Sequence, residues 1–232
     1  MTSLSRYRPS AMNIEQARFN MIEQQIRPWN VLELDILDLL TVVRREEFVQ
    51  AAYKSLAFSD TEIPLPGDSG ECMLSPKVEA RLLQEAAIKK HESVLEIGTG
   101  SGYMAALLAH KARQVVTVEI DAELKAFAEK NLSAYGVRNV EVVEGNGAQG
   151  WLEGKETTYD VIMISGSLAS LPAAFLEQLK VGGRIVAIIG EAPVMVAQVI
   201  YRISDTAYDT RNLFETGARP LRDAAPHSHF KF

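Results

Sequence analysis

The chain has 232 residues, 47% of them hydrophobic, with a formal net charge of −6 and one cysteine. This length fits one α/β domain with an extension, or at most two small domains, and the acidic balance excludes an electrostatic case for nucleic-acid binding. The single cysteine, Cys72, excludes an internal disulfide and fits a reducing compartment. Because no apolar run is as long as a membrane span and the first residues lack a signal-peptide core, we expect a cytoplasmic protein without membrane partners.

The first part of the chain, residues 1–87, predicts a helical extension. Apolar residues recur at helical spacing from Ile14 to Ile26, and Pro28 ends this helix. Prolines and glycines over residues 63–70 predict a loop. Further helices are expected over residues 31–43, 46–56 and 76–87.

Residues 88–232 alternate between strand and helix patterns. The expected strands are 94–97, 115–119, 140–144, 161–165 and 184–189, and the expected helices are 103–111, 122–135 and 173–179. Continuous runs of Val and Ile indicate strands buried on both faces, as in a parallel sheet. Two alternating segments, 194–203 and 210–216, predict an antiparallel hairpin. We therefore expect an α/β, doubly wound, Rossmann-like sheet, mostly parallel, with a C-terminal antiparallel hairpin and the helical extension before it.

A glycine-rich turn joins the first of these strands to the first of these helices. Glycines at alternate positions let the backbone bend sharply and let a ligand approach amide groups that no Cβ shields. The helix that follows presents unpaired N–H groups at its start. This strand–turn–helix unit predicts a nucleotide-like cofactor held by Glu96, Gly98, Thr99, Gly100, Ser101, Gly102 and Tyr103.

Three features favour S-adenosylmethionine over NAD as that cofactor. The dinucleotide fingerprint places its third glycine three residues after the second, but here Tyr103 stands there and the glycine comes one residue early, at Gly102. The Glu96 carboxylate suits an ammonium and a sulfonium and repels a pyrophosphate. Glu119 ends the second strand, about 20 residues after the first glycine, where a carboxylate can accept hydrogen bonds from both ribose hydroxyls.

Further candidates follow the carboxyl ends of the expected strands, beyond which ligands bind in doubly wound sheets. They are Ile120, Gly145, Asn146 and Ser165. Asn146 either contacts an adenine edge or forms a plain Asn-Gly turn. Tyr103 packs either on the methionine part of the cofactor or on the neighbouring helix.

Several runs of the sequence carry a resemblance to a known family. They are RREEFV at 44–49, IPL at 63–65, VLEIGTGSGYMAALLA at 94–109, GNG at 145–147 and LKVGGR at 179–184. Together they resemble the protein-L-isoaspartate O-methyltransferases, which use S-adenosylmethionine. The resemblance implies that residues 1–87 form a helical extension with an acceptor-side loop and residues 88–232 the cofactor-binding domain, as one compact unit. It also implies that Glu119 holds the ribose and residues 98–102 the methionine end.

The acceptor loop departs from the family pattern, Gly-Gln-Thr-Ile-Ser-x-Pro, whose serine lies at the methyl acceptor. Aligned on Gly70 and Pro76, this chain has Leu74 at the serine position and Ser75 one place later. The resemblance therefore implies that Leu74 and Ser75 belong to the acceptor loop, opposite a protein or peptide with an isoaspartyl residue. Asn146 stands where the family usually carries an aspartate.

Three functions fit these residues. A carboxylate acceptor is already ionised at pH 7 and needs no strong general base, which agrees with the lack of a Ser/His/Asp set or of a metal-ligand pattern. His227 and His229 lie in the C-terminal tail and are not expected to bind a metal. The first function is a carboxyl O-methyltransferase that repairs isoaspartyl residues of damaged proteins and releases S-adenosylhomocysteine. The others are a methyltransferase with a different acceptor and a non-catalytic, cofactor-binding regulatory protein.

Overall fold

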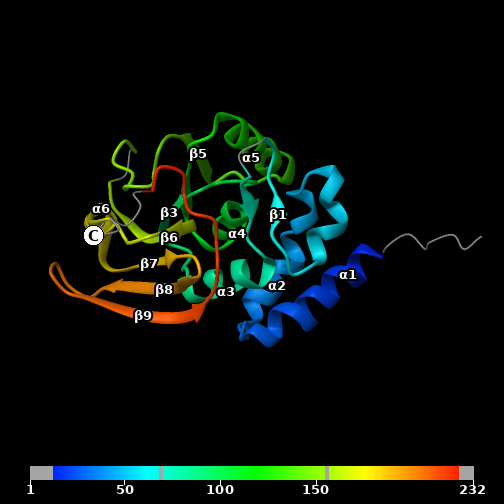
Figure 1. Cartoon of the computed structure of the whole chain (residues 1–232), viewed down its shortest axis with the longest axis horizontal. Helices are drawn as coiled ribbons and strands as arrows, with labels where there is room; N and C mark the ends of the chain where they lie inside the picture. The colour runs from blue at the N-terminus through cyan, green and yellow to red at the C-terminus, as the bar shows by residue number, and fades with distance from the viewer. Residues whose placement is uncertain (1–12, 68–69, 155–156, 225–232) are drawn as a thin grey trace, which may run out of the picture.

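The computed structural model describes residues 13–67, 70–154 and 157–224. Within these ranges, a seven-stranded sheet in the order β5-β4-β3-β6-β7-β8-β9 forms the centre of the molecule (Figure 1). Its strands are β3 (Ser93–Ile97), β4 (Gln114–Glu119), β5 (Val140–Glu144), β6 (Tyr159–Leu168), β7 (Leu179–Glu191), β8 (Val194–Arg202) and β9 (Tyr208–Glu215). The strands from β5 to β7 pair in parallel, and β8 and β9 are antiparallel. The predicted doubly wound sheet with its C-terminal hairpin is confirmed.

Three helices connect the parallel strands: α4 (Tyr103–Lys111), α5 (Ala122–Tyr135) and α6 (Ala173–Glu177). The Asp121 side chain accepts hydrogen bonds from the first turn of α5, and Gly136 ends this helix with a φ of 80°. The expected helix over 173–179 ends earlier, because Leu179 is buried and pairs with Tyr159 as the first residue of β7.

The N-terminal extension is helical but less regular than expected. Its elements are α1 (Ile14–Met21), a π-helical turn (Ile22–Ile26), a 3-10 turn (Arg27–Trp29), α2 (Leu34–Val42) and α3 (Pro76–Ala86). The expected α-helix over 46–56 is instead two 3-10 segments, Arg45–Glu47 and Ala51–Phe58, because Gln50 between them is extended. The expected loop contains a two-residue strand, β1 (Ile63–Pro64), which pairs with β2 (Cys72–Met73).

Alternate residues of the parallel strands enter two separate buried clusters. Val94 pairs with Val161 and Leu95 with Ile162. The two valines belong to one cluster, whereas Leu95 and Ile162 belong to the other. Because successive side chains of a strand point to opposite faces, the sheet is buried on both sides.

The helical extension shares a core with the sheet. Ile26 and Phe48 belong to the same buried cluster as Val161 of β6 and Leu108 of α4. Figure 1 shows α2 beside α3 and α4. The division of the chain at residues 87 and 88 stays a prediction.

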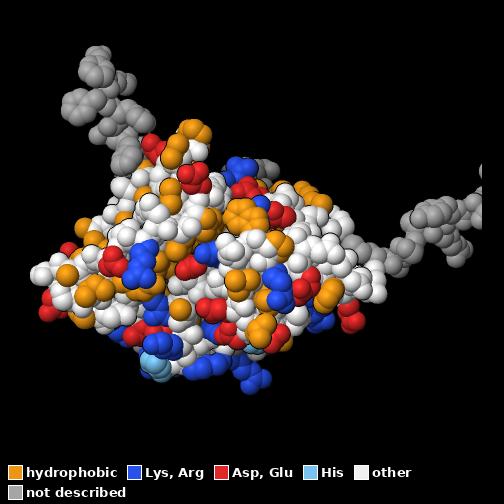
Figure 2. All heavy atoms as spheres, turned by 90° about the horizontal axis from the view of Figure 1, so that it is seen from below, with side chains coloured by type: hydrophobic (Ala, Val, Ile, Leu, Met, Phe, Trp, Pro, Cys, Tyr) orange, Lys and Arg blue, Asp and Glu red, His pale blue; other side chains and the backbone are white. Residues whose placement is uncertain are grey.

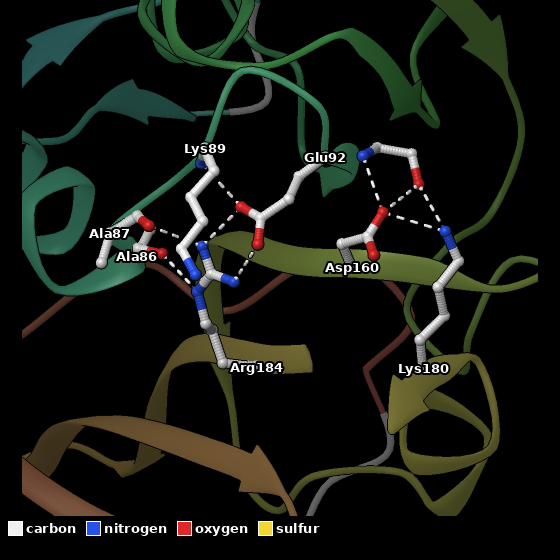
Figure 3. A network of polar contacts seen from close by, with 8 residues as sticks. Ala86, Ala87, Lys89, Glu92, Asp160, Lys180 and Arg184 are labelled. Carbon is white, nitrogen blue, oxygen red and sulfur yellow. Dashed lines mark hydrogen bonds and ion pairs between the residues drawn. The ribbon is translucent and has the colours of Figure 1, made fainter. Parts of the chain in front are cut away.

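A polar network joins α3 to the amino-terminal ends of the parallel strands (Figure 3). The Arg184 guanidinium donates to both carboxylate oxygens of Glu92, each at 2.7 Å. It also donates to the carbonyls of Ala86 and Ala87, which end α3. Beside it, Lys180 contacts Asp160 at 2.9 Å. These bonds fix the base of the sheet at the end opposite to the cavity described below.

None of the helices in the described ranges has the length and apolarity that crossing a bilayer requires. On the face in Figure 2, acidic and basic side chains are interspersed with apolar ones.

Candidate active site

A cavity opens at the carboxyl ends of β3, β4 and β6. It lies where the strand order reverses, with β4 on one side of β3 and β6 on the other, which is where doubly wound sheets bind ligands. Its empty volume, the open mouth included, is about 940 Å³. The sequence-predicted residues that line it are Leu74, Glu96, Gly98, Thr99, Gly100, Ser101, Glu119, Ile120, Gly145, Asn146 and Ser165.

The glycine turn forms the floor of this cavity. Gly100 has a φ of +53°, in the left-handed region that favours glycine. A Cβ at this position would lie 3.1 Å from the Leu65 Cδ1 atom. The Gly102 N–H donates to the Thr99 carbonyl at 2.9 Å, which closes the turn before α4 begins.

Glu119 ends β4 and holds the glycine turn from beside it. Its Oε2 atom accepts from the Gly100 N–H at 2.8 Å and its Oε1 atom from the Asp121 N–H at 3.1 Å. Burial raises the pKa of this carboxyl, and the two backbone donors oppose the rise. Because each carboxylate oxygen has two lone pairs, both oxygens can accept a further hydrogen bond from a ligand.

Glu96, near the end of β3, is fully buried in the cavity wall. Its two oxygens accept from the hydroxyls of Thr117 and Ser165, each at 2.7 Å. Burial raises the pKa of Glu96 to about 8, although these hydroxyl groups lower it; the nearby carboxylates of Glu119 and Glu79 raise it further. A cation bound in the cavity would favour the ionised form.

Asn146 follows β5 and uses both ends of its side-chain amide. Its Oδ1 atom accepts from the Ala148 N–H at 3.0 Å, and its Nδ2 atom donates to Asp223 at 3.2 Å. The Asn146 side chain thus bonds the backbone two residues ahead, as in an Asx turn. Contact with an adenine edge stays a prediction.

Three sequence-predicted residues do not line the cavity. Gly102 begins α4 and packs toward Leu132 of α5. Tyr103 lies in the core, 2% exposed, with its ring centroid 5.5 Å from that of Phe48. Ser75 is the N-cap of α3, and its carbonyl accepts the first helical hydrogen bonds. Tyr103 and Ser75 are thus absent from the cavity lining, and their contacts with a cofactor or acceptor stay predictions.

A buried ion pair behind the acceptor loop was not predicted from the sequence. Arg45 is 1% exposed and contacts the Glu79 carboxylate at 3.0 Å. It also donates to the carbonyls of Ala57 at 3.2 Å and Leu74 at 2.7 Å. Burial raises the pKa of Glu79 to about 7, although the Arg45 charge lowers it. Glu79 lines the cavity, so this pair connects the acceptor loop to α3.

The helical spacing of α3 contained a signal for this pair. Glu79 falls in line with Leu82, Leu83 and Ala86 at the i, i+3, i+4 and i+7 positions of an apolar stripe, and all four residues are buried. A carboxylate in such a stripe requires a buried partner.

The segment that follows β9 forms another wall of the cavity. Figure 1 shows this segment running back toward β5. Arg222 donates to both oxygens of Glu71 in the acceptor loop and to Asp121 at 2.8 Å. The Ser167 N–H donates to the Arg219 carbonyl at 2.8 Å. The acceptor loop, the start of α5 and the end of β6 are therefore tied to one C-terminal segment.

No metal centre accompanies the cavity in the part of the chain that the structure describes. No group of three His, Cys, Asp or Glu side chains there could hold a metal ion. His227 and His229 lie outside the described residues.

Comparison with known proteins finds a family model that matches most of the chain. The family model "Protein-L-isoaspartate(D-aspartate) O-methyltransferase (PCMT)" matches residues 16–223. The chain is 36% identical to the protein-L-isoaspartate O-methyltransferase of Koribacter versatilis over 183 residues, which is 79% of this chain and 81% of the relative. It is 38% identical to that of a Synechococcus strain over 176 residues, 76% of this chain and 70% of the relative.

Two solved structures share the fold. One, named protein-L-isoaspartate O-methyltransferase, has a TM-score of 0.74 and 26% identity; the match covers 89% of this chain but 65% of that chain. The other is a Plasmodium falciparum protein assigned the same name and solved with S-adenosyl-L-homocysteine. Its TM-score is 0.77 at 18% identity, over 91% of this chain and 99% of that one. By the family match over most of its length, this chain belongs to the protein-L-isoaspartate(D-aspartate) O-methyltransferase family.

Proposed function

We propose that this protein is an S-adenosylmethionine-dependent carboxyl O-methyltransferase that acts on isoaspartyl residues of proteins and releases S-adenosylhomocysteine. The observation that carries the proposal is the shared cavity: the carboxylates of Glu96 and Glu119, the glycine turn and Leu74 of the acceptor loop all line it. The relatives' names support the reaction and the acceptor. A cytoplasmic location and a role in protein repair belong to the same proposal.

The residues of the cavity fit this cofactor. Glu119 would accept hydrogen bonds from the ribose, and the backbone of residues 98–101 would hold the methionine end. Glu96 would face its ammonium group, and Asn146 with Ile120 would contact the adenine. When bound, S-adenosylmethionine supplies a methyl group on a positively charged sulfur. Two buried carboxylates suit a positively charged ligand, because a bound cation favours their ionised form.

The protein has little chemistry of its own to perform. Transfer to a carboxylate oxygen forms a C–O bond while the C–S bond breaks, and no proton moves. An acceptor carboxylate is ionised at pH 7, so the side chains act by orienting it in line with the methyl group. The apolar side chains of Met73, Leu74 and Leu221 line the cavity. They exclude water from the path between the acceptor oxygen and the methyl group.

A direct assay tests the proposal. The protein is incubated with S-adenosylmethionine carrying a labelled methyl group and an isoaspartyl peptide, beside the aspartyl peptide of the same sequence. We expect base-labile methyl ester on the isoaspartyl peptide alone. Bound cofactor without any ester would favour the second candidate, a different acceptor, for which Leu74 in place of the family's serine is the supporting observation.

Replacing Leu74 by serine is expected to raise turnover on the isoaspartyl peptide by about tenfold. Leu74 lines the cavity and is 8% exposed, but its side chain cannot donate a hydrogen bond to the acceptor. A hydroxyl bonded to a charged group contributes about 1.5 kcal/mol, which corresponds to roughly tenfold in rate when it acts in the transition state. The initial rate of methyl-ester formation is compared between the wild type and the variant. Leu74→Ala is the control for lost volume, and an equal rise in that variant would refute the hydrogen bond.

Cofactor affinity is expected to increase with pH up to about 8, the value to which burial raises the pKa of Glu96. Below that pH Glu96 holds a proton and cannot attract the ligand's ammonium group. The apparent affinity for S-adenosylhomocysteine should therefore rise by up to about tenfold per pH unit below pH 8, with release of a proton on binding. Calorimetry in buffers of different ionisation enthalpy measures both. In Glu96→Gln the slope should flatten; an unchanged slope would assign the titration to another group.

A further inference from the structure

The cavity is rich in carboxylates, which poses a problem for a carboxylate acceptor. Among its described lining residues are two cations, Arg219 and Arg222, and five glutamates: Glu62, Glu71, Glu79, Glu96 and Glu119. An acceptor carboxylate that enters this cavity loses its hydration, and the glutamates offer it no compensating charge. It therefore needs a positively charged partner on the cavity wall.

Arg222 is already neutralised. It forms ion pairs with Glu71 and with Asp121, and these carboxylates raise its pKa still further. Binding an acceptor through Arg222 would require breaking one of these pairs. This cation holds the acceptor loop and is not available for a ligand.

Arg219 has no such partner among the residues that the structure describes. No ion pair or side-chain hydrogen bond engages its guanidinium there. Its Nη1 atom lies 3.7 Å from the position that a Cβ on Gly70 would take, so the group stands against the start of the acceptor loop. Among the described lining residues, the free cation is therefore on the acceptor side.

The backbone around Arg219 is held by Ser167 at the end of β6. The Ser167 N–H donates to the Arg219 carbonyl at 2.8 Å and its hydroxyl to the Ala218 carbonyl at 3.0 Å. The Leu221 N–H donates back to the Ser167 carbonyl at 3.0 Å. A fixed backbone that carries an unpaired guanidinium is pre-organised, so less entropy is lost when an anion binds.

We propose that Arg219 is the specificity-determining residue that binds the carboxylate of the methyl acceptor. This inference rests on the proposed function, since it names the group that holds the acceptor of that reaction. The planar guanidinium can donate two parallel hydrogen bonds to one carboxylate. A carboxylate has about four lone-pair sites, so one remains free on the attacking oxygen. Arg219 thus supplies the donors that Leu74 lacks.

The test measures peptide binding to the protein saturated with S-adenosylhomocysteine, where no turnover occurs. The probe is an isoaspartyl peptide with blocked termini, so that its only carboxylate is the acceptor group. Its matched partner carries the neutral carboxamide in place of that carboxylate. Wild-type protein should bind the carboxylate peptide at least tenfold more tightly, which is the usual range for a charge-assisted hydrogen bond.

Arg219→Gln should abolish this preference, and Arg219→Lys should keep part of it because the charge remains. Affinity for S-adenosylhomocysteine should not change in either variant. Arg211→Gln is the matched control: it removes a cation on β9 whose side chain is 66% exposed and pairs with Asp209. This control should retain the full preference. In the turnover assay, Arg219→Gln should raise KM for the isoaspartyl peptide far more than it lowers kcat.

The outcomes separate the two proposals. If wild-type protein binds both peptides equally, or if Arg219→Gln keeps the preference, the assignment of Arg219 is overturned even where methylation proceeds. If the preference depends on Arg219 but no methyl ester forms, the binding role is supported and the proposed reaction fails.

Discussion

Replacing Arg45 by methionine is expected to lower the free energy of unfolding by about 3–5 kcal/mol, the usual loss when one partner of a buried ion pair is removed. Arg45 is buried and contacts Glu79 at 3.0 Å, and it satisfies the carbonyls of Ala57 and Leu74. The variant leaves a buried carboxylate and two carbonyl groups without their partner. Urea unfolding at pH 7 measures the loss.

The loss should increase with pH. The pKa of Glu79 is raised to about 7 by burial even with Arg45 present, and without that arginine it must rise further. A carboxyl whose pKa is higher in the folded state destabilises it as the pH rises from the unfolded pKa toward the folded one. The Arg45→Met variant should therefore come closest to wild type near pH 5 and fall furthest behind above pH 8.

A double variant provides the control. Arg45→Met with Glu79→Leu removes both charges and should regain a large part of the stability, because an apolar pair often substitutes for a buried ion pair at little cost. If Arg45→Met alone unfolds at the same urea concentration as wild type, the pair does not stabilise the fold.

Replacing Gly100 by valine is expected to abolish binding of S-adenosylhomocysteine, by more than about a hundredfold in affinity, while the fold survives. A β-branched residue is strained at a φ of +53°, and its Cβ would meet the Leu65 side chain. The turn must then shift, which withdraws the Gly100 N–H from Glu119. Calorimetry measures the binding, and circular dichroism with thermal unfolding verifies the fold.

Gly136→Val is the matched control for this substitution. Gly136 has a φ of +80° at the end of α5, and a Cβ there meets no atom within 4 Å. The control therefore carries comparable backbone strain, at a position far from the glycine turn in the sequence. It should lower the stability of the fold without changing the affinity for S-adenosylhomocysteine. Normal affinity in a folded Gly100→Val protein would show that the turn is not the cofactor site.

The parallel sheet could be predicted because its signals are local. Runs of Val and Ile marked the strands, and Asp121 with Gly136 marked both ends of α5. Helix α6 was predicted to extend too far because the sequence around Leu179 is compatible with either a helix or a strand. Its pairing with Tyr159, twenty positions away in the sequence, decided the outcome.

The site could be predicted only where the chain itself brings residues together. In the turn, Ser101 and Met104 line the cavity while Tyr103 between them does not, because each helical residue is rotated by about 100° from the last. Tyr103 was predicted as a ligand contact because it is adjacent in sequence to the residues of the turn. Arg219 and Arg222 reach the cavity, and Arg45 reaches Glu79 in its wall, through tertiary packing with distant segments, which no local pattern specifies.

The C-terminal segment has a consequence for how ligand binding and folding are coupled. Arg219 to Arg222 reach the cavity only after β8 and β9 have paired with β7, since this segment follows β9 directly. A ligand that contacts this wall binds only molecules whose hairpin is closed, so it lowers the population with an open hairpin by mass action. Amide hydrogens of β8 and β9, remote from the glycine turn in sequence, should thereby report occupancy of the cavity through slower exchange with solvent.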